Sequence, residues 1–187
     1  MKQYIKIALI LFAICAVSAA LLAGVNAITA PQIAANALKE TSAALMDISG
    51  GYSLGEKRDG EGNVNYVITL VDGKTIMGYV LEINSNGYGG PITLVASYKT
   101  SGELIGAKMM ANSETPGLGK KSEESWYMQQ FVGFGADKPI PTSKNDLADP
   151  SLVSGATVTF TGVSSAINNG CEYVKSLGGN WCHIPKN

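Results

Sequence analysis

Hydrophobic and polar positions divide the chain into three parts, and the first is an uncharged apolar run from Ile7 to about Ile28. About 20 apolar residues are enough for a helix to cross the hydrocarbon core of a bilayer. A cleaved signal peptide would also export the remainder of the chain, but its apolar segment usually has only about 7–15 residues. We therefore predict an uncleaved, single-pass membrane anchor over residues 1–30. Lys2 and Lys6 precede the run, which places the N-terminus in the cytoplasm and the main domain outside.

Alanine-rich sequence follows the anchor and is typical of a helix. Pro31 suits the first turn of a new helix, and Gln32 to Ile48 has its apolar residues roughly on one side. We predict a linking helix over residues 31–49, followed by an extracytoplasmic domain over residues 50–187. The glycine-rich, charged stretch Gly50–Asn63 indicates a loop or the edge of a hairpin.

Four segments in the middle of the chain have the β-branched and apolar composition of strands. Asp72-Gly73 and Ser101-Gly102 are turn signals between the first and last pairs of these segments. Hairpins in succession give an antiparallel sheet, and helices before and after it give an α+β fold. The predicted fold class is an antiparallel sheet flanked by helices, with one N-terminal transmembrane helix. The expected strands are Val64–Val71, Lys74–Ile83, Ile92–Tyr98 and Glu103–Met110.

The C-terminal part contains one strongly amphipathic helical pattern, which begins close to Thr157. Ser154 is a good N-cap candidate, and this places Thr157 in the first turn. The unpaired N–H groups of a helix start favour phosphate, although most capped helices bind nothing, so the local pattern alone favours a structural role. The residues expected on the buried face are Phe160, Val163, Ile167, Cys171, Val174 and Leu177.

Two glycine-containing segments precede this helix, and both have an ordinary structural interpretation. Pro116-Gly117 fits the central positions of a type II turn, which requires positive φ at the glycine and places Leu118 at the tip of a stiff loop. Gly87 to Gly90 breaks the strand pattern before Pro91. From the local sequence alone, a β-turn and a strand-breaking loop are the favoured interpretations.

The segment between the strands and the last helix is predicted to hold one short helix. It spans Ser122–Phe131, with Ser122 as N-cap and Glu123 and Glu124 in the first turn. Residues 133–150 are expected to form a polar linker that contains three prolines.

Charge and cysteine content exclude several classes of function. The 187 residues carry 14 Lys and Arg against 15 Asp and Glu without any basic run, which argues against a nucleic-acid binder. A disulfide between Cys171 and Cys182 is compatible with an extracytoplasmic location, and the sequence leaves its state open. His183 is the single histidine, so neither a metal site nor a catalytic triad is predicted.

Three motifs and the anchor together carry a resemblance to a known family. The motifs, in order, are Gly87-Tyr88-Gly89-Gly90, Glu114-Thr115-Pro116-Gly117-Leu118-Gly119 and Ser154-Gly155-Ala156-Thr157. The anchor ends in Asn26–Pro31. In these features the sequence resembles RnfG, a component of the Rnf ion-translocating electron-transport complex, and is similar to the sister family in the sodium-pumping NADH:quinone reductase.

The resemblance implies a covalent cofactor. A separate flavin transferase attaches FMN through its phosphate to the threonine of the third motif, which is Thr157 in this sequence. Thr159 lies two positions on and is the residue most easily mistaken for it. The remaining cofactor-binding residues that the resemblance suggests are Ser154, Gly155, Ala156, Thr159, Glu114, Thr115, Gly117, Leu118, Gly119, Gly87, Tyr88 and Gly89.

The resemblance also implies a redox subunit without substrate turnover of its own, and no catalytic residue is predicted. It would belong to an ion-translocating ferredoxin:NAD oxidoreductase in the bacterial inner membrane, in contact with lipid and other membrane subunits. The sequence departs from the family in two places, since Ser151 replaces a usual Asp and Asn112 replaces a frequent His. The alternatives are an FMN domain of another redox chain or regulator, and a flavin-free anchored binding domain. A secreted hydrolase is least favoured because the single histidine has no evident partner.

Overall fold

The computed structural model describes residues 2–147, 149–153 and 155–177 of the chain. The predictions that concern Ser154, Cys182 and His183 lie outside these residues. The chain divides into two compact units, one up to Ser42 and one from Ala43 onward. We describe each unit by itself.

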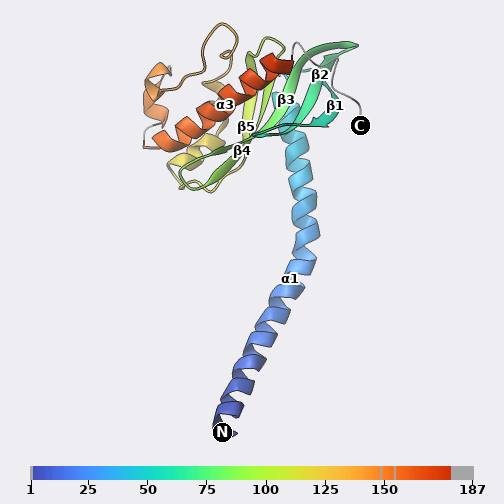
Figure 1. Ribbon diagram of the computed structural model, residues 1–187, viewed down its shortest axis with the longest axis vertical. Helices are drawn as coiled ribbons and strands as arrows, with labels where there is room; N and C mark the ends of the chain where they lie inside the picture. The colour runs from blue at the N-terminus through green and yellow to red at the C-terminus, as the bar shows by residue number, and fades with distance from the viewer. Residues whose placement is uncertain (1, 148, 154, 178–187) are drawn as a thin grey trace. The chain divides into compact units, whose positions relative to one another are not determined.

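The first unit consists of helix α1, which spans Lys2–Ile48 and extends with its last turn into the second unit. Pro31 lies inside this helix, so the predicted start of a second helix at Pro31 is wrong (Figure 1). A proline removes one backbone hydrogen bond and crowds the carbonyl four residues earlier. The alanine-rich sequence on both sides favours helix strongly enough to continue through that gap.

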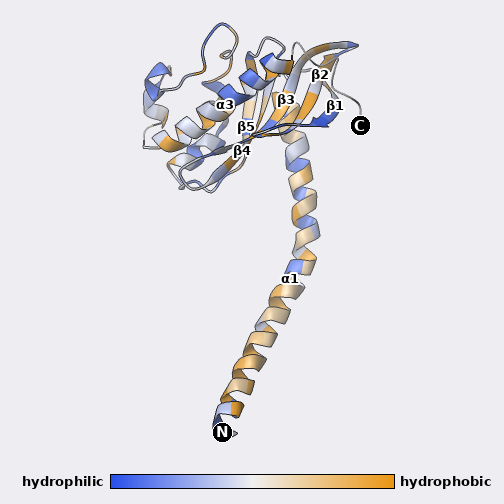
Figure 2. Cartoon of the chain, viewed as in Figure 1, coloured by the Kyte–Doolittle hydropathy of each residue, from blue (hydrophilic) through white to orange (hydrophobic). Residues whose placement is uncertain are grey.

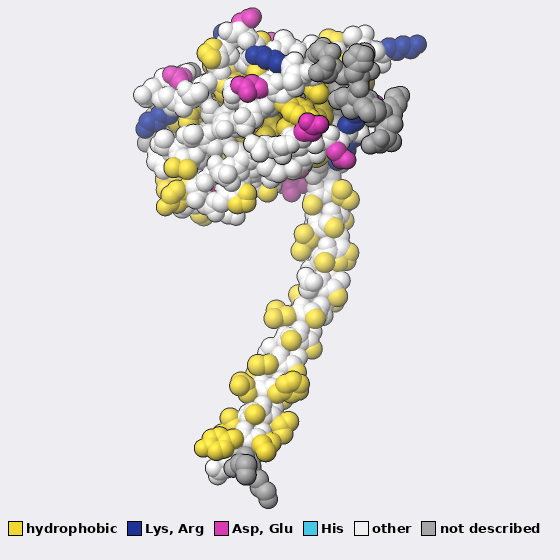
Figure 3. All heavy atoms as spheres, viewed as in Figure 1, with side chains coloured by type: hydrophobic (Ala, Val, Ile, Leu, Met, Phe, Trp, Pro, Cys, Tyr) yellow, Lys and Arg dark blue, Asp and Glu magenta, His cyan; other side chains and the backbone are white. Residues whose placement is uncertain are grey.

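The surface of α1 is apolar along its N-terminal part. All residues from 3 to 40 are exposed, and Ile, Leu, Val and Phe predominate among the large side chains up to Ile28. Figure 2 shows the hydrophobic colouring of this part of the helix, and Figure 3 shows its apolar side chains around the helix. By length and composition α1 can cross a membrane. An exposed apolar surface of this extent is rare on proteins that contact only water.

The second unit is built on a five-stranded antiparallel sheet in the order β1-β2-β3-β4-β5. All four predicted strands are confirmed, and the hairpin-edge alternative for Gly50–Asn63 is realised as β1. This edge strand carries four charged side chains and a register shift, two features that discourage pairing with other chains. The strands are β1 (Ser53–Asp59), β2 (Val64–Asp72), β3 (Thr75–Asn86), β4 (Pro91–Lys99) and β5 (Leu104–Ala111).

Helix α3 (Thr157–Leu177) packs on β3 and β4 and covers one face of the sheet, together with the short helix α2 (Ser125–Gln129) (Figure 1). All six residues predicted for its buried face are buried. Successive strand residues point to opposite faces. Leu81 and Leu94 therefore face α3, whereas Val80 and Val95 join a second core with Ile48 from the last turn of α1.

The segment between β5 and α3 differs from its prediction. A 3₁₀ helix, η1 (Gly119–Glu123), precedes α2, so the predicted N-cap role of Ser122 is wrong. Ser122 is buried, and its hydroxyl donates to the Gly119 carbonyl at 2.8 Å, because the turn at Pro116-Gly117 leads straight into η1.

The expected polar linker over residues 133–150 also contributes to the core. Ile140 and Leu147 are buried, and the buried Ser164 hydroxyl of α3 donates to the Pro141 carbonyl. Two further 3₁₀ helices, η2 (Lys144–Asp146) and η3 (Pro150–Val153), lead the chain to α3.

Candidate functional site at the start of helix α3

The three motifs of the sequence meet around one cleft in the second unit. Its volume of about 530 Å³ lies within the range of roughly 300–1,000 Å³ typical of small-molecule and cofactor sites. The lining combines apolar side chains with hydroxyl groups and glycine backbone. Its residues are Tyr88, Glu114, Thr115, Leu118, Gly119, Gly155, Ala156, Thr157, Val158 and Thr159.

The first wall of the cleft is the connection between β3 and β4. The Gly87 N–H donates to the Gly90 carbonyl at 2.8 Å and closes the hairpin. Gly90 has a φ of +136°, a backbone conformation that residues other than glycine rarely adopt. The Tyr88 side chain is 74% exposed, so it offers a large aromatic surface at the cleft.

The second wall is the loop after β5. Gly117 has a φ of +77°, and the Leu118 N–H donates to the Thr115 carbonyl at 3.2 Å, which confirms the predicted turn with positive φ at the glycine. The side chain of Leu118 is 45% exposed. An added Cβ on Gly155 would lie 3.0 Å from this leucine, so the tip of the turn touches the approach to α3.

The third wall is the first turn of α3. The Phe160 N–H donates to the Ala156 carbonyl at 2.9 Å, which puts Ala156 in the capping position and Thr157 at the first helical residue. The N–H groups of Thr157, Val158 and Thr159 have no acceptor within the helix. Thr157 and Val158 are exposed at the cleft, whereas Thr159 is only 1% exposed.

Glu114 connects the three walls. Its side chain is only 3% exposed, one carboxylate oxygen accepts the Thr159 hydroxyl at 2.7 Å, and the other accepts the Gly89 N–H at 3.1 Å. An added Cβ on Gly87 or Gly119 would lie 2.0 Å or 2.3 Å from the same carboxylate. The glycines thus make the space that the carboxylate occupies.

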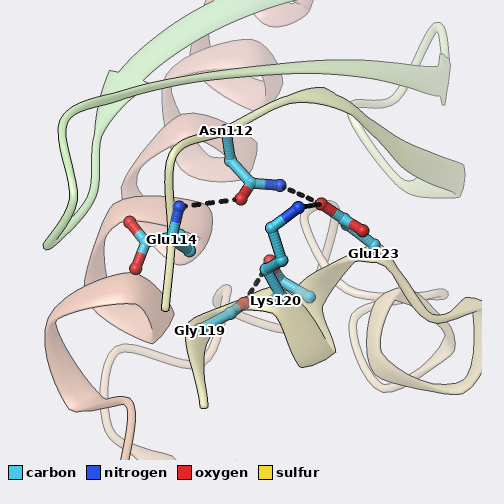
Figure 4. Close-up of polar contacts among 6 residues, drawn as sticks. Asn112, Glu114, Gly119, Lys120 and Glu123 are labelled. Atoms are coloured by element: carbon cyan, nitrogen blue, oxygen red, sulfur yellow. Dashed lines mark hydrogen bonds and ion pairs between the residues drawn. The ribbon is translucent and has the colours of Figure 1, made fainter. Parts of the chain in front are cut away.

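A polar network behind the loop holds the backbone of Glu114 (Figure 4). The Asn112 side-chain oxygen accepts the Glu114 N–H at 3.0 Å, and its amide nitrogen donates to Glu123 at 2.8 Å. Lys120 pairs with the same Glu123 carboxylate at 3.4 Å. Asn112 therefore acts on the loop rather than on the cleft.

Tyr127 of α2 lies near the same carboxylate. Its hydroxyl is buried and has no hydrogen-bond partner among the described residues. Burial raises the pKa of Tyr127, and the negative charge of Glu114 raises it further. Sequence reasoning placed Tyr127 only within the range of the predicted short helix, because nothing in the local pattern relates it to Glu114.

Nine of the predicted site residues line the cleft, and three others are neighbours of residues that line it. Gly87 and Gly89 contact Glu114, and Gly117 forms the turn. Sequence reasoning missed Val158, whose side chain is exposed. The signal in the sequence is an apolar residue between Thr157 and Thr159. Among the described residues, no cluster of His, Cys, Asp or Glu suits a metal ion.

Comparison with known proteins agrees with this geometry. Residues 87–172 match the family model of the FMN-binding domain, and residues 1–48 match that of the RnfG N-terminal region. The corresponding subunit of the ion-translocating oxidoreductase complex from Methanosarcina acetivorans is 30% identical over 186 residues, which cover 95% of this chain and 98% of that protein. The chain belongs to the RnfG family.

Other relatives of the RnfG family match over different lengths. The corresponding subunit of the Na(+)-translocating ferredoxin:NAD(+) oxidoreductase complex from Acetobacterium woodii is 25% identical, and the match covers 94% of each chain. The relative from Shewanella baltica is 32% identical over 65% of this chain. The chain spans only 59% of that protein and 58% of the relative from Clostridium ljungdahlii.

Proposed function

We propose that this RnfG family member is a membrane-anchored electron-transfer subunit that carries FMN on Thr157. It would act within an ion-translocating ferredoxin:NAD oxidoreductase complex, the activity given in the names of the Acetobacterium and Clostridium relatives. The observation that carries the proposal is the meeting of the exposed Thr157 with the other two motifs around one cleft.

The residues of the cleft fit a flavin nucleotide in both of its parts. Tyr88, Leu118 and Val158 offer exposed apolar surface for the ring system. The N–H groups at the start of α3, which have no acceptor within the helix, suit the phosphate because the positive end of the helix dipole lies there as well. The bound flavin would supply one- and two-electron transfer. The residues of the cleft would position the flavin, provide apolar contact to its ring system and place the Glu114 carboxylate beside it.

Accessibility distinguishes the two candidate attachment residues. Thr157 is exposed at the cleft, so a transferase can reach its hydroxyl. Thr159 is buried, and its hydroxyl already donates to Glu114 at 2.7 Å. Modification of Thr159 would break this hydrogen bond and leave the buried Glu114 carboxylate with one donor fewer. We therefore assign the phosphoester to Thr157 and a supporting role to Thr159.

Recognition by the flavin transferase also concerns the segment before α3. Ser151 stands where the family usually has Asp, and both its N–H and its hydroxyl donate to the exposed Asp149 carboxylate, at 3.0 and 2.6 Å. A carboxylate is thus present two residues from the usual position. We propose that Asp149 takes over its part in recognition.

The anchor completes the proposal. Residues 1–30 would cross the inner membrane, with the N-terminus in the cytoplasm and residues 50–187 outside, and residues 31–49 would link the two. Other membrane subunits would exchange electrons with the flavin. A covalent link would keep the cofactor on the protein in a compartment where free FMN is scarce.

Intact mass and in-gel flavin fluorescence of the denatured protein test this proposal. Wild-type protein produced with a flavin transferase should gain the mass of one esterified FMN, and Thr157→Ala should lose both the mass and the fluorescence. Thr159→Val is the matched control and should keep both. Wild-type protein that gained no flavin would instead support a flavin-free binding domain.

A further inference from the structure

Glu114 is a buried carboxylate that the proposed electron transfer does not itself require. The side chain is 3% exposed, and both carboxyl oxygens accept hydrogen bonds, one from the Gly89 N–H and one from the Thr159 hydroxyl. Within the described part of the chain it forms no ion pair, because Lys120 of the same loop pairs with Glu123. Within the described residues the cleft therefore holds a buried carboxylate without a paired cation.

Tyr127 lies close to this carboxylate but is not hydrogen-bonded to it. Burial raises the pKa of the Tyr127 hydroxyl, and the negative charge of Glu114 raises it further. Charges act over longer distances in a poorly solvated interior than at a surface, where water and salt screen them. Since Glu114 also lines the cleft, a group bound there would experience the same field.

We propose that the buried Glu114 carboxylate lowers the reduction potential of a flavin held in this cleft and thereby makes it a stronger electron donor. This inference rests on the proposed function, because it requires flavin on Thr157. Reduction adds negative charge to a flavin, and a fixed negative charge nearby disfavours that change. Glu114 is thus a positioning residue for the three walls and also sets the potential.

A purely structural role for Glu114 is the competing interpretation, and glutamine separates the two. In Glu114→Gln the side-chain oxygen can still accept the Gly89 N–H, and the amide nitrogen can donate to the Thr159 oxygen. The variant keeps the links among the walls and removes only the charge. Glu123→Gln is the matched control, because it removes a carboxylate that is 46% exposed and paired with Lys120.

The experiment is a redox titration of the full-length protein with FMN attached, followed by visible absorbance. In the Glu114→Gln protein that carries flavin, the midpoint potential should shift to values more positive than that of the wild type. Glu123→Gln should leave the potential unchanged. A Glu114→Gln potential equal to that of Glu123→Gln would overturn the inference. Thermal melting of the flavin-free proteins provides a second readout, in which Glu114→Gln should remain close to the wild type.

Thr159→Val supplies an independent test should Glu114→Gln fail to fold. It removes one hydrogen-bond donor and keeps the charge, so its potential should equal that of the wild type or become more negative. A positive shift in Thr159→Val would contradict the inference. Failure of the proposed function is distinguishable from both outcomes, because the wild-type protein would then carry no flavin to titrate.

Discussion

Replacement of Thr159 by valine changes one hydroxyl to a methyl group and keeps the β-branched shape of the side chain. The lost hydroxyl donates to the buried Glu114 carboxylate at 2.7 Å, and the Gly89 N–H at 3.1 Å remains as a donor. A hydrogen bond to a charged group contributes about 1.5–3 kcal/mol to stability. For a domain of this size, 1 kcal/mol shifts the melting temperature by about 2–4 °C. Thr159→Val should therefore melt about 3–12 °C below the wild type.

Thr157→Val is the control for the change in melting temperature expected of Thr159→Val. Thr157 is exposed, so the substitution should change the free energy of unfolding by no more than about 0.5 kcal/mol. Circular dichroism melting of protein made without flavin transferase measures both variants under identical conditions. After production with the transferase, intact mass should show flavin on Thr159→Val and none on Thr157→Val. Equal melting temperatures would refute the reasoning about Glu114.

Two further substitutions test the packing around the site and the core. Gly119→Ala should lower the free energy of unfolding by about 1–3 kcal/mol, because the new Cβ would lie 2.3 Å from the Glu114 carboxylate; an unchanged urea midpoint would contradict this placement. Burial raises the pKa of Tyr98 well above its usual value, so above about pH 10 the unfolded chain loses a proton that the folded chain keeps. Stability should be fully present below about pH 10 and decline as pH rises further, and Tyr98→Phe should show a shallower decline in melting temperature.

Periodicity in the sequence predicts the fold well wherever one face of an element is buried. The six apolar positions of α3 and the four predicted strands are confirmed, because burial decides their pattern. The predicted break at Pro31 is wrong because one missing hydrogen bond does not outweigh the helix preference of its neighbours. The predicted cap at Ser122 is wrong because its hydroxyl bonds within η1.

The site could be predicted only in part. The motifs identify Thr157 and the Pro116-Gly117 turn from local sequence and from a family resemblance. The bond between Glu114 and Thr159 spans 45 positions, and it depends on the register of β5 and on the exact start of α3. Local patterns contain no information about such a distance. The buried carboxylate at the cleft could therefore be recognised only in the structure.

Two glycines within α3 explain how its first turn reaches the cleft. An added Cβ on Gly162 would lie 2.3 Å from the Asn86 carbonyl, and one on Gly170 would lie 2.4 Å from the Tyr98 hydroxyl. Glycine inside a helix costs roughly 0.5–1 kcal/mol relative to alanine, so helix formation alone does not favour either residue. Close approach of α3 to β3 and β4 requires both. Because this approach fixes the position of the helix, it also holds Thr157 beside the connection between the same two strands.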